Sequence, residues 1–204
     1  MRDWKRAAAL PVGFFSQDVI AVGRGLLGAV LVTSFEGHTT AGRIVEVEAY
    51  LGAADPASHA FEFRRNRQNE SIYGAPGNWY VYRSYGVHWC ANLVCGPPGV
   101  GAAVLIRALE PVAGLEVMRR RRGTTADRLL CAGPGRLCEA MGIARELDGA
   151  AMRRSAALVK PGCMPPSGGV VATTRVGISR GRDALLRFVL RDSIYLSRPV
   201  RAEN

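Results

Sequence analysis

Residues 78–92 read NWYVYRSYGVHWCAN, with three tyrosines, two tryptophans and a histidine in a chain that is only 7% aromatic. The side chains of residues 79–84 alternate as they do in a β-strand. Gly86 permits a tight turn, and a second β-like run covers residues 87–94. The stretch therefore predicts a β-hairpin with Tyr85 at or near its tip, where a large flat side chain needs a partner to stack on.

The apolar spacing along the rest of the chain predicts short strands and helices. Ser16 is the expected N-cap of a first helix that ends at Gly28, and Pro111 is expected to open a later helix. The expected strands span residues 29–33, 41–50, 102–109, 170–176 and 185–196, and the later helices span residues 111–122 and 137–141. We therefore expect an α+β fold, a single domain over residues 1–204 with a curved, largely antiparallel sheet, flanking helices and a protruding β-hairpin.

The net charge of +10 at pH 7 comes almost entirely from arginine, because lysine occurs only at Lys5 and Lys160. Arginine binds phosphates through two N–H groups and stacks on bases, so nucleic acid is the expected partner. The alternative is that coding bias enriched arginine and that the charges are simply solvated.

The composition also argues against several classes of protein. No apolar run is long enough to span a bilayer, and the N-terminal residues are too weakly apolar for a secretion signal, so we expect a cytoplasmic protein, nucleoid-associated if bacterial, with no membrane partner. The cysteines number five, form no Cys-x-x-Cys pair and lie far in sequence from two of the three histidines. Buried free thiols are therefore expected, rather than a zinc site or disulfides.

The strand expected at residues 41–50 carries the second candidate group. Strict alternation places Ile44, Glu46, Glu48 and Tyr50 on one face, with Cα atoms two residues apart separated by roughly 6.5–7 Å. The alternative for Glu46 is that it is an ordinary solvent-exposed side chain on this strand face. Glu48 and Tyr50 lie where the strand opens onto a loop, and binding groups concentrate at such places.

Further candidates lie in a loop and among single arginines. The segment 52–77 is rich in Gly, Pro and polar residues, and loops of this length are usually functional or disordered. It contains His59, although a lone loop histidine more often has no role in a site.

Arg107 is the only charged residue in an apolar run, so it needs a buried or ligand partner. Arg136 follows Gly-Pro-Gly at an expected helix start, which suits a phosphate but is common.

Three classes of function fit these features. The first is an enzyme that extrudes a base from DNA and acts on it, because a basic surface, an aromatic hairpin tip and a carboxylate beside tyrosines occur together. The second is a non-catalytic module that uses tyrosines as a stacking platform for nucleic acid. The third is a metal-dependent nuclease, which lacks the usual cluster of aspartates and would use Glu46, Glu48, His59 and His88.

Six blocks of the sequence resemble the alkyladenine (3-methyladenine) DNA glycosylase family, the metal-free monofunctional alkylpurine glycosylases. The blocks, which agree in residue type and spacing, are residues 42–52 (GRIVEVEAYLG), 55–60 (DPASHA), 80–92 (YVYRSYGVHWCAN), 105–111 (LIRALEP), 133–138 (GPGRLC) and 175–177 (RVG). The resemblance implies base excision repair: hydrolysis of the N-glycosidic bond of alkylated, 3-methyladenine-type purines in duplex DNA after base flipping, with deaminated purines as a further class. It implies no cofactor and no lyase activity, and we expect a monomer.

The resemblance also assigns roles to residues. Glu48 matches the general base that orients and deprotonates the attacking water, and Tyr85 matches the side chain that fills the gap left by the flipped nucleotide. Asn92 matches the residue that crowds the exocyclic amine of guanine, and Arg107 matches a positive group beside the flipped nucleotide. The residues that match the walls of the base pocket are Tyr50, His59 and Tyr82. Glu46 matches no catalytic role, so we expect it to be structural.

The chain departs from the family before the hairpin. The family's Arg-Asn pair is replaced by Gln68-Asn69, and its preceding proline by Arg67. The arginines expected to contact the DNA backbone are Arg64, Arg65, Arg67 and Arg136. No lysine lies near the motifs in sequence, so we expect no Schiff base and no strand cleavage.

Overall fold

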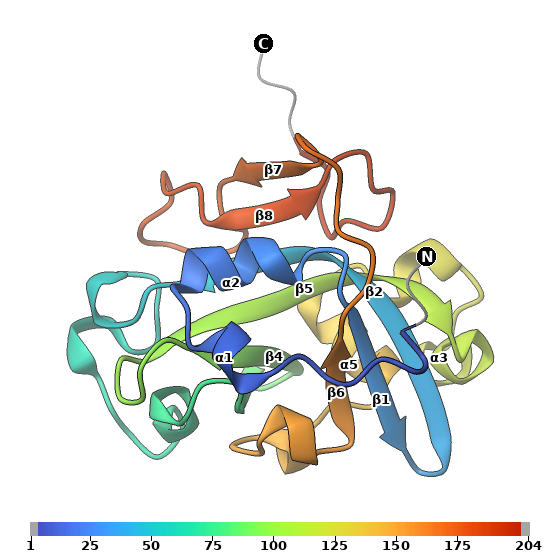
Figure 1. The fold of residues 1–204 in the computed structure, drawn as a ribbon, viewed down its shortest axis with the longest axis horizontal. Coiled ribbons are helices and arrows are strands. Elements are labelled where there is room, and N and C mark those ends of the chain that lie inside the picture. The colour runs from blue at the N-terminus through green and yellow to red at the C-terminus, as the bar shows by residue number, and fades with distance from the viewer. Residues whose placement is uncertain (1–3, 201–204) are drawn as a thin grey trace.

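The structure, a computed structural model, describes residues 4–200, so the ends of the expected domain, 1–3 and 201–204, lie outside the described residues. Its strands are β1 (Val30–Phe35), β2 (His38–Tyr50), β3 (Trp79–Ser84), β4 (His88–Cys95), β5 (Ala102–Ala113), β6 (Ala157–Lys160), β7 (Val170–Thr173) and β8 (Arg187–Leu190). They form one curled sheet in the order β3-β4-β5-β2-β1-β6, and β8 pairs with both β2 and β7 (Figure 1).

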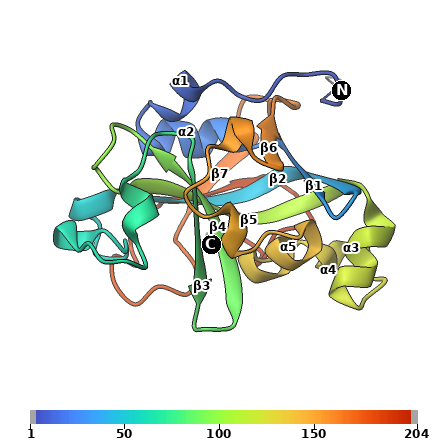
Figure 2. The same ribbon diagram turned by 90° about the horizontal axis from the view of Figure 1, so that it is seen from below.

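Helices cover both sides of this sheet. They are α1 (Val12–Phe15), α2 (Val19–Leu26), α3 (Leu115–Arg122), α4 (Asp127–Leu130) and α5 (Pro134–Met141). Figure 2 shows α1 and α2 on one side of the sheet and α3, α4 and α5 on the other. Every ladder between the described strands is antiparallel, so the α+β class is confirmed.

The strand β2 is the centre of the sheet, because it pairs with β1, β5 and β8. Register shifts on either side of Glu46 leave first Val45 of β2 and then Arg107 of β5 without a cross-strand partner, and the earlier register resumes at Val47. Ile44 and Val45 are both buried in the main core.

The hairpin expected from residues 78–92 is formed by β3 and β4. Its turn contains Tyr85 and Gly86 with φ of 50° and 68°, the two successive positive values that a tight hairpin turn of this twist needs. Trp79 and Val81 pack in the main core, whereas Tyr80 belongs to a separate small cluster. The two faces of β3 are thus divided between core packing and a second, aromatic environment.

Four expected boundaries are wrong. The cap of α2 is Asp18, whose Oδ1 accepts hydrogen bonds from the amides of residues 20 and 21 at 2.9 and 3.3 Å; Ser16 instead ends α1. Pro111 lies inside β5, next to a register shift, and α3 begins only after Gly114. The last two strands end earlier than expected, at Thr173 and Leu190.

The loop 52–77 contains three short 3₁₀ helices, η1 (Gly52–Ala54), η2 (Phe61–Phe63) and η3 (Glu70–Tyr73).

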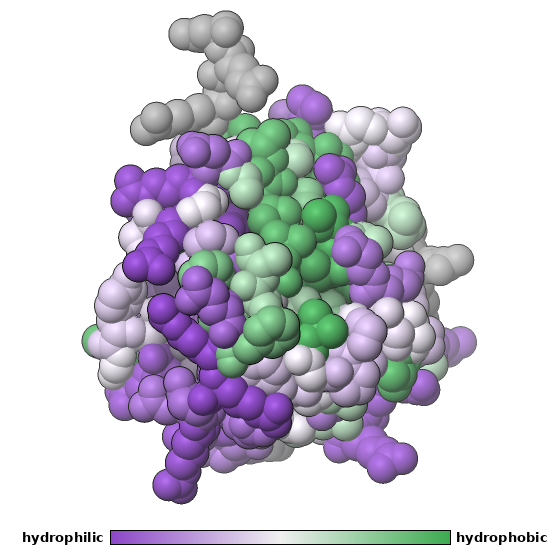
Figure 3. Space-filling view, turned by 90° about the vertical axis from the view of Figure 1, so that its left-hand side faces the viewer, coloured by the Kyte–Doolittle hydropathy of each residue, from purple (hydrophilic) through white to green (hydrophobic). Residues whose placement is uncertain are grey.

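All five cysteines are free and four are buried, as expected. Burial raises the pKa of the Cys131 thiol to about 12. Among residues 4–200, no helix is both long and apolar enough to cross a membrane. On the face seen in Figure 3, hydrophilic side chains flank a central apolar band.

The cap of α2 gives a direct test of this fold. Asp18→Ala removes the acceptor of two helix amides, so we expect the free energy of unfolding to fall by about 1 kcal/mol in urea titrations. Ser16→Ala is the matched control and should change it by much less, because the Ser16 hydroxyl bonds only a carbonyl in α1. An equal loss in both variants would contradict this assignment of the cap.

Candidate active site

The carboxylate of Glu48 is fully buried near the end of β2. Its Oε2 accepts hydrogen bonds from the Tyr50 hydroxyl at 2.8 Å and from Nη1 of Arg107 at 3.2 Å. Its Oε1 accepts one from the amide of Val176 at 2.7 Å. A carboxylate offers about four acceptor positions, so these three donors fix its plane and leave Oε1 able to accept a further hydrogen bond.

Arg107 connects the two carboxylates of β2. Its Nε donates to Oε1 of Glu46 at 3.0 Å, while Nη1 donates to Glu48. Its side chain is only 8% exposed, which confirms the expectation that this lone arginine has buried partners. Glu48 and Arg107, which match the family's general base and positive group, are therefore in direct contact.

Glu46 is fully buried, so the alternative of a solvated strand face is wrong. Its carboxylate also accepts from Nε of Arg187 at 2.8 Å and from the amide and hydroxyl of Ser197, each at 2.6 Å. Burial raises the pKa of Glu46, but Arg107 and Arg187 outweigh that effect and hold it below its ordinary value of 4.5. Four protein donors bind this carboxylate, three of them at Oε1, as suits a structural residue.

A second buried ion pair lies behind Tyr50. Nη2 of Arg175 donates to Oδ1 of Asp55 at 2.8 Å, Nη1 donates to Oδ2, and both side chains are 1% exposed. The guanidinium carbon of Arg175 lies 4.8 Å from the centroid of the Tyr50 ring. Burial and the neighbouring Glu48 raise the pKa of Tyr50 far above its ordinary value, so its hydroxyl stays protonated.

The side chains of His59 and Tyr82, two of the expected pocket walls, lie against each other beside the hairpin. Their ring centroids are 4.5 Å apart, and Tyr82 stacks on Tyr80 at 5.3 Å. Nδ1 of His59 lies 2.6 Å from the Tyr80 hydroxyl. Burial lowers the pKa of His59, which favours the neutral imidazole, and it raises the pKa of both tyrosines.

Asn92 lies opposite Tyr80 in the β3–β4 ladder and is 3% exposed. Its Nδ2 donates to the backbone carbonyl of Tyr80 at 3.0 Å and to that of Cys90 at 3.4 Å. The amide is thus fixed by backbone groups beside the aromatic cluster. The structure therefore places Asn92 next to the walls that the resemblance implies.

The remaining candidates lie outside this cluster. Tyr85 is 91% exposed at the hairpin tip. Arg136 is exposed in the first turn of α5, where a side chain at Gly135 would collide with His88 of the hairpin, so this helix start abuts β4. Arg65 forms an exposed ion pair with Glu70. Arg64 and Arg67 are exposed in the loop after η2.

Several site residues were not assigned a role from the sequence. Tyr80 positions His59 through its hydroxyl, and Asn69 donates to the backbone carbonyls of His59 and Arg64, each at 2.9 Å. Asn69, which the chain shares with the family's Arg-Asn pair, thus supports the loop that carries His59. Asp55 and Arg175 lie in blocks that resemble the family, and that is the only signal that could have identified them.

The four residues of the nuclease alternative do not form a cation site. Glu46 and Glu48 are paired with arginines, and His88 is exposed on the hairpin. Within residues 4–200, no group of three or more His, Cys, Asp or Glu side chains is arranged to hold a metal ion.

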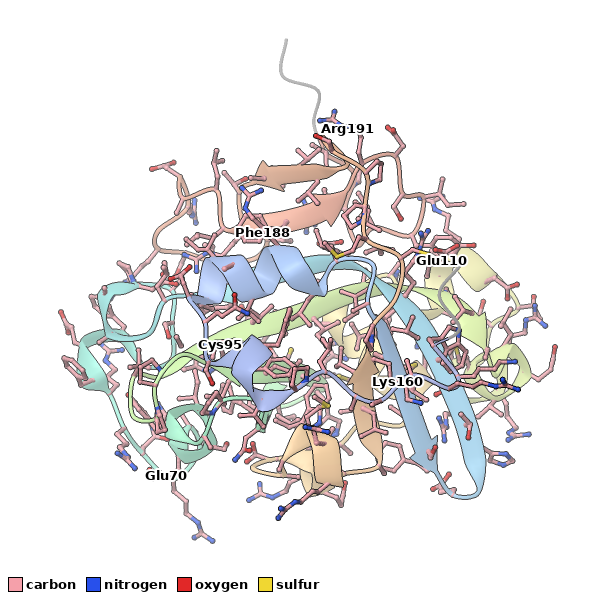
Figure 4. The ribbon with its side chains drawn as sticks, in the orientation of Figure 1. Glu70, Cys95, Glu110, Lys160, Phe188 and Arg191 are labelled. Atoms are coloured by element: carbon pink, nitrogen blue, oxygen red, sulfur yellow. The ribbon has the colours of Figure 1, made fainter. Side chains whose placement is uncertain are left out.

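The two lysines also lie apart from the site. Figure 4 labels Lys160 on β6, which pairs with β1, and Phe188 on β8, which pairs with β2 beside Glu46 and Glu48. Arg187, next to Phe188, lies opposite Glu48 in the β2–β8 ladder. Nζ of Lys160, by contrast, donates to the backbone carbonyl of Lys5 at 3.2 Å.

A buried carboxylate with three fixed donors thus lies near an aromatic cluster at the β3–β4 hairpin. The methylpurine-DNA glycosylase (MPG) family matches this chain over residues 13–194. The chain belongs to the methylpurine-DNA glycosylase family. It is therefore a DNA glycosylase, as the resemblance of its motifs implied.

Curated relatives support the same assignment over almost the whole chain. A protein of Nitrosospira multiformis is 48% identical, covering 92% of this chain and 93% of the relative. A protein of Methanoculleus marisnigri is 47% identical over 93% and 98%, and one of Agrobacterium fabrum is 45% identical over 93% and 92%. The names of all three describe a 3-methyladenine DNA glycosylase.

The lowered pKa of Glu46 makes the stability of this glycosylase depend on pH. A carboxyl whose folded pKa lies below its unfolded value stabilises the fold fully above that value, here 4.5, and loses this contribution as pH falls through the folded pKa. We expect the free energy of unfolding, measured in urea, to fall as the pH is lowered below 4.5. Asp55, whose pKa is also lowered, should add to the same slope.

Glu46→Gln should reduce this slope and cost about 3–5 kcal/mol near neutral pH, because it leaves Arg107 and Arg187 with unbalanced buried charge. Glu70→Gln is the matched control, since its ion pair with Arg65 is more than half exposed and screened by solvent. A wild-type stability that does not change between pH 5 and the acid range would contradict the buried-carboxylate account.

Proposed function

We propose that this glycosylase hydrolyses the N-glycosidic bond of 3-methyladenine-type purines in duplex DNA, with the damaged nucleotide flipped out of the helix. The observation that carries the proposal is the buried, three-donor carboxylate of Glu48 beside the aromatic rings of Tyr50, Tyr82 and His59. The names of the curated relatives point to the same lesion. A flipped base is required because the bond is inaccessible inside a stacked duplex.

Glu48 acts as the general base. Water forms a bond to C1′ as the bond from C1′ to the base nitrogen breaks, the bonding electrons leave with the base, and a proton of the water passes to Glu48. The sugar develops oxocarbenium character in this step, which a nearby carboxylate stabilises. The fixed donors Tyr50, Arg107 and Val176 hold that carboxylate in position.

The aromatic walls receive the flipped base. A methylated purine carries a positive charge, so it stacks favourably on the electron-rich rings of Tyr50 and Tyr82 and leaves readily as a neutral molecule. A neutral imidazole at His59 avoids repulsion of that charge. Asn92 disfavours guanine by crowding its exocyclic amine. Deaminated purines are a further substrate class, but their neutral bases need protonation to leave.

The exposed hairpin tip contacts the DNA. Tyr85 wedges into the minor groove and fills the gap left by the flipped nucleotide, which explains a tyrosine that is 91% exposed. Exposed arginines neutralise backbone phosphates on either side. These are Arg64, Arg67 and Arg136, with Arg65 available when it leaves Glu70. The enzyme acts as a monomer, and because Lys160 lies away from Glu48 it leaves an abasic site without cleaving the strand.

The decisive experiment measures free base released from methylated duplex DNA by the wild-type protein. We expect 3-methyladenine in the supernatant and an abasic strand that remains intact until treated with alkali. Binding of methylated DNA without any released base would instead support the non-catalytic stacking module. Activity abolished by a chelator would favour the nuclease alternative.

Tyr85→Ala tests the wedge. We expect binding to lesion-containing duplex to weaken by about tenfold or more in a fluorescence anisotropy titration, because the gap in the helix is then left unfilled. The melting temperature should not change, since the side chain makes no core contact. Met164→Ala, also at an exposed apolar residue but in the segment between β6 and β7, is the control. Unchanged binding by Tyr85→Ala would exclude the wedge role.

A further inference from the structure

We propose that Arg175 and Asp55 form a specificity-determining pair, in which the charge behind Tyr50 sets the preference between cationic and neutral bases in front of it. The inference rests on the proposed function, because it places the flipped base against the free face of that ring. It assigns to a buried ion pair a role in choosing substrates rather than in stability alone.

The pair is held in a fixed geometry. The guanidinium of Arg175 donates to both carboxylate oxygens of Asp55, to the backbone carbonyl of Ala49 at 3.1 Å and to that of Gly181 at 3.5 Å. Its Nε is the one buried side-chain nitrogen or oxygen in residues 4–200 without a hydrogen-bond partner. The guanidinium is therefore held by the two bonds to Asp55, by two backbone carbonyls and by its contact with the Tyr50 ring, although Nε remains unpaired.

The same residue contacts both parts of the site. The carbonyl that accepts from Arg175 belongs to Ala49, which lies between Glu48 and Tyr50 in the sequence. The residue after Arg175, Val176, provides the amide that binds Oε1 of Glu48. Movement of this guanidinium would therefore displace both the Tyr50 ring and the Val176 amide that binds Glu48.

The loop 174–181 closes over the pair. Gly181 has a φ of 59°, and a Cβ there would lie 3.2 Å from Nη2 of Arg175 and 3.7 Å from Oδ1 of Asp55. Asp55 also accepts from the amides of Leu51 and Ala57 at 3.1 and 3.0 Å. Burial raises the pKa of Asp55, but these donors and Arg175 outweigh it and keep the carboxyl ionised. The charge behind Tyr50 is thus a cation partly balanced by an anion.

The physics of the ring gives the effect a sign. A cation attracts the electrons of an aromatic ring, so Arg175 on one face weakens the attraction of a second cation to the other face. The pair also acts through space in a dry environment, where charges are poorly screened. Removing the cation should therefore favour a cationic methylated base over a neutral one, whereas removing the anion should have the opposite effect.

The test compares equilibrium binding of two lesions rather than turnover. The probes are duplexes with 7-methylguanine, which is cationic, or hypoxanthine, which is neutral, each on a 2′-fluorinated sugar that blocks hydrolysis. Arg175→Gln should shift the ratio of the two dissociation constants about two- to fivefold toward the cationic base. Asp55→Asn should shift it in the other direction, and the double variant should return it close to the wild-type ratio.

Arg43→Gln, which disrupts the partly exposed pair with Glu110, is the matched control and should leave the ratio unchanged. If the pair is merely structural, each variant that folds binds both lesion duplexes more weakly by the same factor. That result would overturn the inference. If Arg175→Gln fails to fold, the direction in which Asp55→Asn shifts the ratio of the two dissociation constants decides the test. A wild-type protein that releases no base from unfluorinated DNA would overturn the proposed function instead.

Discussion

Arg107 lies between Glu46 and Glu48 inside the sheet, and the rest of the site depends on this contact. Burying an ionised carboxylate is costly unless opposite charge and hydrogen bonds compensate it. Two further arginines complete that compensation, because Arg187 pairs with Glu46 and Arg175 with Asp55. Three carboxylates and three guanidiniums thus form an electrically balanced cluster around Glu48.

This cluster joins segments that lie far apart in the chain. Arg107 comes from β5, Val176 from the loop after β7, and Arg187 from β8, while the amide of Ser197 reaches Glu46 from beyond the last strand. The C-terminal third of the chain therefore completes the surroundings of Glu46 and Glu48 on β2. A polar network of this kind contributes geometry more than stability, because hydrophobic residues of similar volume could replace it in a purely structural core.

The sequence predicted the features that depend on local patterns. The aromatic alternation and Gly86 predicted the hairpin, and the solitary Arg107 predicted a buried partner. The features that it missed depend on partners distant in the chain: the burial of Glu46 by Arg187 and Ser197, and the position of Arg175 behind Tyr50. Pro111 was misassigned because proline suits both a helix start and an irregular strand position, and only the register shift beside Gly42 distinguishes them.

The central claim is that Glu48 performs the chemistry while its neighbours hold it in place. The most direct measurement is the single-turnover rate of base release by Glu48→Gln, together with its affinity for the same methylated duplex and with exposed Glu139→Gln as the control. We expect the rate to fall by at least about a thousandfold while the affinity stays close to that of the wild type. A variant that still releases base at the wild-type rate would contradict the account.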